Sequence, residues 1–297
     1  MRVKVLTFNI RYSEAEDGPN SWPFRKDLAI ETVHDRAPDL LALQEPTGKQ
    51  WDDFTGAFPG LKGIFADAHD GGPYQHGVAL MYRPERFDLT GQRIFWQSDT
   101  PDVPGSISGP NQWGPRPTAV ARLRDRQDGG EFVFACTHLD THPGCWLPSV
   151  RINNTEITRF AGGLPVILAG DFNCSAGSEA YKYLTGAAGF HDAWTEAGMP
   201  DEGATTFHEF YGLEKLPIDQ PDKLRGFLEA SVAGWPQFAH YPEHVMKYRN
   251  YRIDWIMIRG AWKAISAGID VRKGPDGRCA SDHWAVEAVL EKSGLSQ

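Results

Sequence analysis

Polar side chains that could do chemistry stand at the ends of apolar runs along this chain. Asn9 ends one run, Glu45 follows a second, and His138 ends a third. Three further groups lie in short polar motifs beside later runs: Gly170-Asp171-Phe172-Asn173, Arg252-Ile253-Asp254 and Ser281-Asp282-His283. Because strand ends present rigidly held side chains to solvent, these six groups predict a single cleft at one edge of the sheets.

The residue types in this set indicate the chemistry of the cleft. Carboxylates and an amide oxygen are hard ligands, which favour Mg²⁺, with Mn²⁺ as a substitute, over zinc. The histidines, one of them beside an acidic residue, supply groups for proton transfer and anion binding. The sequence contains no G-x-S-x-G elbow and no G-x-x-x-x-G-K-[ST] loop, so acyl transfer and P-loop chemistry lack support.

The apolar runs that must position these groups alternate with a few helical segments. A hairpin is predicted around Asp128-Gly129-Gly130, a sequence typical of a tight turn. Many strands with few helices predict two packed sheets flanked by helices. The expected strands are 3–8, 40–43, 78–82, 87–96, 118–123, 131–137, 166–169, 253–258 and 284–290, and the expected helices are 25–36, 150–160 and 178–184.

Composition bounds the class of protein. The chain has 297 residues, of which 41% are hydrophobic, so it can bury a large core. Its charge, 30 − 39 = −9, disfavours a broad basic surface that grips polyphosphate, although a bound divalent cation can reverse the local sign. No run approaches the roughly 20 apolar residues of a membrane span. We therefore expect one domain, 1–297, that is cytoplasmic and by default monomeric.

The cysteines and one long segment complete the organisation. The four cysteines form no C-x-x-C pair, which favours reduced thiols over a disulfide framework. The segment 207–250 is rich in aromatic residues, prolines and glycines and joins two of the polar motifs. We expect it to be an insertion at the cleft rim that helps to select the substrate; a surface subdomain is the alternative.

The motifs that carry the polar groups resemble those of the endonuclease/exonuclease/phosphatase superfamily, which has the deoxyribonuclease-I-like fold. Besides the three motifs above, the matching segments are Thr7-Phe8-Asn9-Ile10, Leu43-Gln44-Glu45 and Thr137-His138-Leu139. The stretch 95–106 is similar to a bacterial branch related to the nocturnin and deadenylase type. The resemblance implies an α/β, four-layer α/β/β/α sandwich of two mainly antiparallel sheets, with the site at one rim.

The same resemblance implies hydrolysis of a phosphate ester by water, without a covalent enzyme intermediate. Glu45 would be the principal metal ligand, with Asn9 and Asp282 near the metal. Asp171 would orient or deprotonate the attacking water, and Asn173 would hold that water or a phosphoryl oxygen.

The remaining predicted site residues contact the phosphoryl group or the substrate. His138 and His283, the latter oriented by Asp254, would contact the phosphoryl oxygens. Arg116 resembles an arginine found before the central hairpin in this branch and is expected to bind substrate, with a rim salt bridge as the alternative. Tyr82 is expected to line the cleft, with a place in the core as the alternative.

The function that these observations favour is a magnesium-dependent phosphoesterase acting on a phosphodiester. Its substrate class stays open among nucleic acid, nucleotides, lipid head groups and sugar phosphodiesters. The runner-up is a phosphomonoesterase acting on a small phosphorylated metabolite, nucleotide or lipid head group. A noncatalytic binding module is disfavoured because Glu45, Asp171 and His283 are all present.

Overall fold

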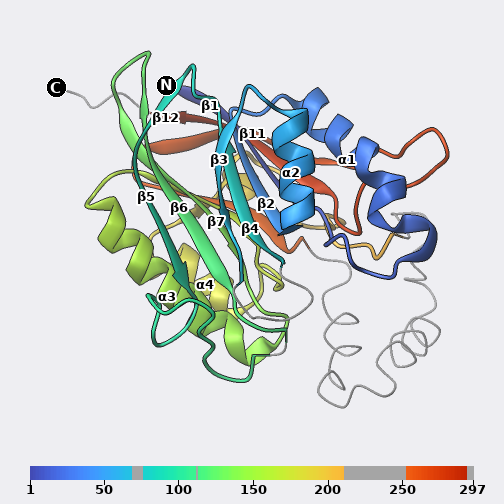
Figure 1. Ribbon diagram of the computed structural model, residues 1–297. Helices are drawn as coiled ribbons and strands as arrows, with labels where there is room; N and C mark the ends of the chain where they lie inside the picture. The colour runs from blue at the N-terminus through green and yellow to red at the C-terminus, as the bar shows by residue number, and fades with distance from the viewer. Residues whose placement is uncertain (69–75, 112, 211–251, 293–297) are drawn as a thin grey trace.

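The computed structural model describes residues 1–68, 76–111, 113–210 and 252–292, and it arranges their strands in two six-stranded sheets (Figure 1). The first sheet has the order β11-β12-β1-β2-β4-β3 and the second has the order β5-β6-β7-β8-β10-β9. The first is built from β1 (Arg2–Asn9), β2 (Leu40–Thr47), β3 (Lys62–Ala66), β4 (His76–Tyr82), β11 (Trp262–Asp270) and β12 (Ala285–Lys292). The second is built from β5 (Phe87–Trp96), β6 (Pro117–Asp125), β7 (Glu131–His138), β8 (Val166–Asp171), β9 (His191–Asp192) and β10 (Asp254–Arg259).

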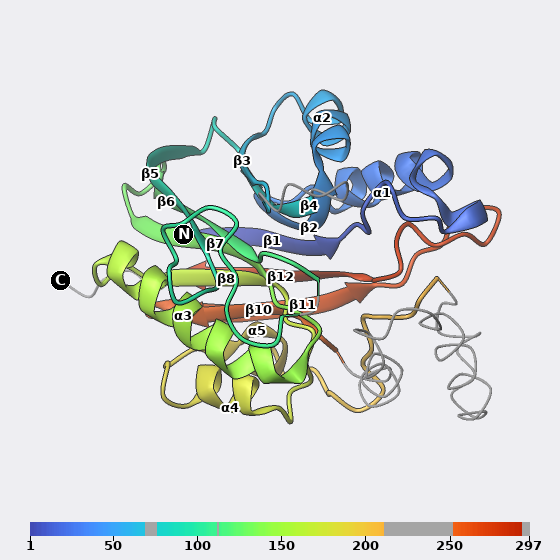
Figure 2. The same cartoon turned by 60° about the horizontal axis from the view of Figure 1, so that its bottom comes forward.

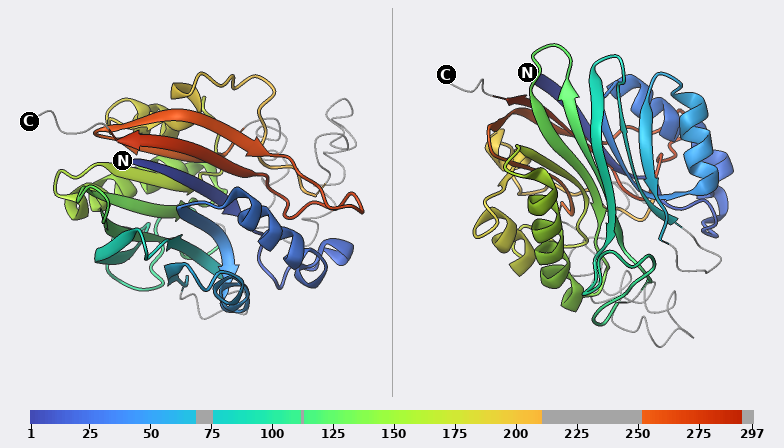
Figure 3. Two further views of the ribbon diagram at one scale, coloured as in Figure 1. Left: turned by 90° about the horizontal axis from the view of Figure 1, so that it is seen from above. Right: turned by 60° about the vertical axis from the view of Figure 1, so that its left-hand side comes forward.

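Each sheet contains one parallel pair, β1–β2 in the first and β7–β8 in the second, and its other pairs are antiparallel. Two helices cover the outer face of the first sheet, α1 (Trp22–Arg36) and α2 (Gly48–Ala57). Two others cover the second sheet, α3 (Pro143–Ala161) and α4 (Glu179–Thr185) (Figure 3). The expected α/β/β/α sandwich of mainly antiparallel sheets is therefore confirmed.

Continuous apolar runs arise because both faces of the central strands are buried. Along β1, Val5 belongs to the core between the sheets, whereas Leu6 packs under the helices on the outer face. The same alternation places Ile167 of β8 between the sheets and Leu168 under α3 and α4. A strand buried on both faces has no polar face, so it reads as an unbroken hydrophobic segment.

The predicted elements are present, with shifted ends, and several others were missed. The helix expected from residue 25 begins at Trp22, and the one expected from residue 150 begins at Pro143, where a missing N–H costs no helical bond. The missed elements are α2, β3, β9, β11 and α5 (Ala193–Glu196), with a single 3-10 turn at Gly18–Asn20. No helix in the described ranges is long and apolar enough to cross a membrane.

The topology brings the polar strand ends together. The parallel pairs place the ends of β1 and β2, and those of β7 and β8, at one edge of their sheets. Because β10 runs antiparallel to β8, its first residue pairs with the last residue of β8, and the residues before β12 likewise lie beside the end of β1. Most of the predicted 207–250 insertion falls in 211–251, outside the described residues; 207–210 run alongside these strand ends.

Candidate active site

Asp171, the last residue of β8, is the centre of the polar cluster. Its Oδ2 accepts a hydrogen bond of 3.0 Å from Asn9 Nδ2 and lies 3.3 Å from His138 Nε2 and 3.7 Å from His283 Nε2. Its Oδ1 accepts the backbone N–H of Asn173 at 2.8 Å. Burial alone would raise the pKa of Asp171, but the two histidines outweigh that effect and hold it well below its usual range. The carboxylate is therefore ionised at neutral pH.

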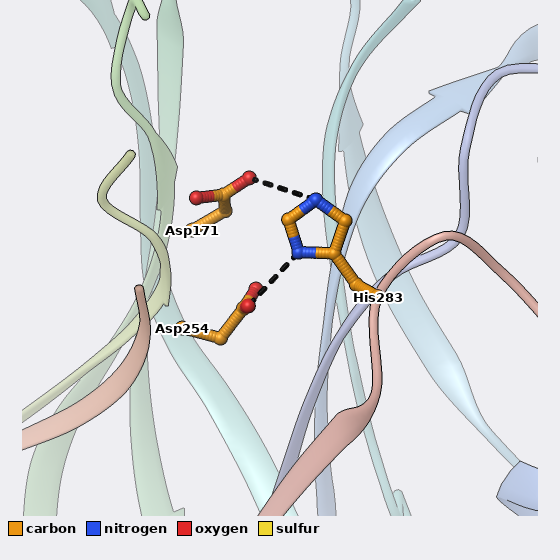
Figure 4. A group of neighbouring side chains, drawn as sticks. All are labelled: Asp171, Asp254 and His283. Carbon is orange, nitrogen blue, oxygen red and sulfur yellow. Dashed lines mark hydrogen bonds and ion pairs between the residues drawn. The ribbon is translucent and has the colours of Figure 1, made fainter. Parts of the chain in front are cut away.

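His283 is paired on its other side with Asp254, the first residue of β10. Figure 4 shows the ring between the two carboxylates, with Nδ1 at 2.9 Å from Asp254 Oδ2 and Nε2 facing Asp171. Burial would lower the pKa of His283, but Asp254 and Asp171 outweigh it and raise the pKa to about 10. His283 is therefore an imidazolium at neutral pH, and the predicted orienting role of Asp254 agrees with this geometry.

His138 is held in the opposite way. Its Nδ1 lies 3.2 Å from Nη1 of Arg116, and a guanidinium can only donate. Nδ1 is therefore the acceptor in this contact, and Nε2 lies 3.3 Å from Asp171 Oδ2. Arg116 is fixed by Asp140, with 3.4 Å between Nη2 and Oδ2. This ion pair is buried rather than at the rim, and the same guanidinium contacts a site histidine.

Asn173 joins this group from the turn after β8. Its backbone is left-handed, with φ of 51°, which asparagine tolerates better than most residues. Its Nδ2 donates to the carbonyl of Leu139 at 2.8 Å and lies 3.0 Å from His138 Nε2. The amide is therefore fixed beside the imidazole and Asp171.

Glu45 stands on the other side of the cluster, at a bulge in β2. Its backbone is left-handed, with φ of 65°, and the strand register shifts between Gln44 and Thr47. Its two oxygens accept from Asn9 Nδ2 and from the N–H of Tyr12, both at 3.2 Å. Such a backbone is uncommon for glutamate and is typical of functional sites.

The electrostatics of Glu45 and Asp282 fit a divalent cation. Burial would raise the pKa of Glu45, but His76 and other nearby cations lower it to about 2, so it is ionised. Burial and the charge of Glu45 raise the pKa of Asp282, although Arg11, 3.7 Å away, opposes them. Glu45, which is half-buried, and Asp282, which is buried, are hard-oxygen donors whose repulsion a bound cation would relieve.

Asn9 differs from its predicted part as an oxygen ligand. Its Oδ1 accepts the backbone N–H of Arg11 at 3.0 Å, so its nitrogen faces Glu45 and Asp171. Reversing the amide would place Nδ2 of Asn9 against the backbone N–H of Arg11, so that two donors would face each other. Asn9 therefore links Glu45 to Asp171 as a hydrogen-bond donor.

Asp171, Asp254 and His283 also form a group whose ligand atoms lie within 4.8 Å of one another, which could hold a metal ion. In this arrangement the imidazolium itself lies between the two carboxylates and offsets part of their negative charge (Figure 4). Glu45 and Asp282, the carboxylates that the sequence predicts near the metal, lie apart from this group and share the Arg11 guanidinium, which is 3.7 Å from Asp282.

Sequence reasoning missed several residues that hold the site. His76, at the start of β4, stacks on Tyr12 with ring centroids 5.1 Å apart. Burial and the charge of Arg116 lower the pKa of His76 to about 4, against the pull of Glu45. Asp140 was missed although it lies two residues after His138, a spacing that offered a signal.

Arg25 was read only as part of a helix. It is fully buried and donates to the carbonyls of Ile10, Arg11, Asn20 and Ala280. These bonds tie α1 to the loops that follow Asn9 and precede Asp282. No local sequence signal identifies such a role, because it depends on contacts 255 residues apart.

Tyr82 does not lie with the other predicted site residues, and its placement in the cleft was wrong. It ends β4, where it pairs with Leu40, the first residue of β2, and packs in the core between the sheets. His76, at the other end of the same strand, is the β4 residue that lies at the site. The core alternative is therefore correct.

Comparisons with known sequences agree with this geometry. The Endonuclease/Exonuclease/phosphatase family profile matches residues 6–283. Nocturnin of Drosophila melanogaster is 27% identical over 187 residues, which cover 56% of this chain and 26% of that protein. The CCR4-Not complex 3'-5'-exoribonuclease subunit Ccr4 of Emericella nidulans is 22% identical over 367 residues, covering 99% of this chain and 52% of that protein. The chain thus spans about a quarter to a half of these curated relatives.

Solved structures share the fold. The endonuclease/exonuclease/phosphatase from Bacteroides vulgatus superimposes with a TM-score of 0.80 at 24% identity, covering 99% of this chain and 100% of that one. The mannosyl-6-phosphatase Bt3783 of Bacteroides thetaiotaomicron superimposes with a TM-score of 0.74 at 23% identity, covering 97% and 99%. At these identities the likeness concerns the fold alone.

Proposed function

Because the chain belongs to the endonuclease/exonuclease/phosphatase family, we propose that it is a metal-dependent hydrolase that cleaves a phosphodiester by attack of an activated water. The observation that carries this proposal is the ionised Asp171 carboxylate between two differently held imidazoles. A carboxylate accepts a hydrogen bond from water, and donors on either side stabilise the charge that develops on phosphoryl oxygens.

Each site residue has a separate role in the proposed reaction. Asp171 orients the water and accepts its proton, and Asn173, fixed by Leu139, holds the water or a phosphoryl oxygen. His283, kept charged by Asp254, donates from Nε2 to the phosphoryl or leaving oxygen. His138, whose Nδ1 accepts from Arg116, contacts a phosphoryl oxygen through its Nε2. Fixed donors of this kind cost no reorganisation when the reaction occurs.

Glu45 and Asp282 would hold the cation, for which we propose Mg²⁺, with Mn²⁺ as a substitute. When bound, such a cation supplies Lewis-acid stabilisation of phosphoryl charge. Asn9 keeps Glu45 and Asp171 in a fixed relation through its two bonds of 3.2 and 3.0 Å.

Two observations bear on the ester class. A relative that aligns with nearly the whole chain is named as an exoribonuclease subunit, which supports a diester and leaves nucleic acid and nucleotides as substrates to test. The mannosyl-6-phosphatase among the structural neighbours supports the second candidate, a phosphomonoesterase acting on a small phosphorylated metabolite. We favour the diester.

The deciding experiment compares bis-p-nitrophenyl phosphate with p-nitrophenyl phosphate, each with Mg²⁺, Mn²⁺ or a chelator. We expect metal-dependent release from the diester and none with the chelator. Release from the monoester alone would replace the proposal with the phosphatase. No release from either, with a folded protein, would contradict a generic phosphoesterase.

A further inference from the structure

The two members of the Asp254–His283 pair come from different sheets. Asp254 begins β10 in the second sheet, and His283 precedes β12 in the first. Their bond of 2.9 Å therefore spans the gap between the sheets, where a small shift of one sheet against the other would break it. Something local must fix this spacing.

Thr206 makes bonds to both sides of that gap. Its Oγ1 accepts the backbone N–H groups of Ile253 at 3.0 Å and Asp254 at 3.2 Å. Its carbonyl accepts the N–H of Trp284, next to His283, at 2.7 Å. Thr206 is fully buried, so these bonds do not compete with water. One residue thus holds the backbones that carry both members of the pair.

The neighbours of Thr206 strengthen the contact on the His283 side. Phe207 forms an antiparallel bridge with His283, and their ring centroids are 4.9 Å apart. The N–H of His208 donates to the carbonyl of Asp282 at 2.8 Å. Without the hydroxyl of Thr206, the backbone around His283 would stay anchored through these contacts. The backbone N–H groups of Ile253 and Asp254 would instead lose their acceptor.

We propose that Thr206 is a positioning residue for the Asp254–His283 pair, with its hydroxyl setting the distance between the two sheets at the site. The inference rests on the proposed function for its kinetic consequence, because His283 must be aimed at the phosphoryl group. Misplacing such a group by about 1 Å can cost on the order of a hundredfold in rate.

The test compares Thr206→Val, which keeps the shape and removes the hydroxyl, with Thr206→Ser, which keeps the hydroxyl. On bis-p-nitrophenyl phosphate with Mg²⁺, we expect Thr206→Val to lose roughly ten- to a hundredfold in kcat with KM little changed, and Thr206→Ser to retain kcat. The control is Thr32→Val, which removes a buried hydroxyl bonded to Leu28 on α1, away from the site, and should leave kcat unchanged. Wild-type kcat in Thr206→Val, or an equal loss in Thr206→Ser, would overturn the proposal.

A second readout separates this proposal from the proposed function. The Nδ1 proton of His283, bonded to Asp254, should give a downfield proton resonance, assigned by its loss in His283→Asn. We expect it to weaken or shift in Thr206→Val, or in Thr206→Ala should the valine variant not fold, and to persist in Thr32→Val. If the wild type hydrolyses neither ester, the proposed function fails, and an unchanged resonance in the Thr206 variant would independently overturn the positioning role.

Discussion

Asp171 shares its carboxylate with two imidazoles that differ in what holds them. Nδ1 of His283 contacts the carboxylate of Asp254, whereas Nδ1 of His138 contacts the guanidinium of Arg116. The first arrangement keeps a ring charged and the second makes Nδ1 an acceptor. At the residue scale, the site is thus a carboxylate flanked by two imidazoles, one paired with a carboxylate and the other with a guanidinium.

The first prediction concerns the carboxylate itself. Asp171→Asn keeps the shape but removes the charge and the proton acceptor, so kcat should fall by roughly 10²- to 10⁴-fold with the fold intact. The matched control is Asp53→Asn, the same change at a carboxylate that accepts from Trp22 Nε1 at 2.8 Å on the helical side of the first sheet. Steady-state kinetics and circular dichroism check both variants. Near-wild-type turnover in Asp171→Asn would mean that the site is assigned wrongly.

The second prediction concerns the charge of His283 in metal-free protein. Its pKa rises from about 6.5 in the unfolded chain to about 10 in the folded one. The charged His283 therefore contributes its full stabilisation of the folded protein below about pH 6.5. That contribution is lost as the pH rises toward 10. Urea unfolding of wild type and His283→Gln with a chelator measures it. The stability difference between them should shrink over that window, and a difference that grew with pH would contradict the assignment.

The sequence identified residues that belong to a recognisable motif. It did not identify residues whose role depends on contacts with distant parts of the chain. Asp171, Asn173, Asp254 and His283 meet as expected because strand ends converge. Tyr82 was misplaced because the strand has two ends and its sequence does not say which one faces the site. The role of Arg25 depends on carbonyls from distant loops, which no local pattern reveals.

At the scale of elements, β7 and β8 lie so close together that β8 requires a glycine at position 170. A Cβ on Gly170 would lie 2.0 Å from the carbonyl oxygen of Thr137, its partner across the parallel pair. The glycine before Asp171 is therefore needed for the strand spacing that sets His138 opposite Asp171.

This contact leads to the third prediction. Gly170→Ala should lower the free energy of unfolding by about 3 kcal/mol, because backbone cannot give way as a flexible side chain can. Gly56→Ala is the matched control, since nothing lies within 4 Å of a Cβ there in α2. It should instead gain about 0.5–1 kcal/mol. Chemical denaturation measures both, and a neutral Gly170→Ala would show that the strands can separate.

The elements that sequence reasoning missed show what hydrophobic runs cannot reveal. α2 begins with a capping box between Thr47 and Gln50, a signal that the sequence does contain. β11 lies at the edge of its sheet with many residues half-buried or exposed, so it shows no continuous apolar run. Apolar runs identify strands that are buried on both faces, and β11 has no such run.

At the scale of the whole molecule, the four cysteines report on whether both sheets unfold together. All four thiols are buried, with Cys136 between the sheets and Cys174 under the outer helices. Burial raises the pKa of Cys136 and of Cys145 to about 12. A thiol that is buried and protonated reacts slowly.

The fourth prediction follows from this burial. The native protein should react with essentially no thiol reagent at pH 8, and all four cysteines should become reactive together in urea. Mass spectrometry of the labelled chain at intermediate urea distinguishes one cooperative step from two. A species with only part of its thiols labelled would contradict the single-domain prediction for 1–297.

The path of the chain through the sheets has a consequence for its synthesis. Strands β5 to β10 of the second sheet come from one continuous stretch, 87–259, whereas the first sheet combines β1 to β4 with β11 and β12 (Figure 2). A nascent chain that has emerged to residue 260 already carries Asn9, Glu45 and Asp171, but it has neither Asp282 nor His283, and β1 has no partner in place of β12. The cationic imidazole therefore reaches the site only when the segment around β12 has been made and closes the first sheet, and the proposed hydrolase should be inactive on the ribosome until then.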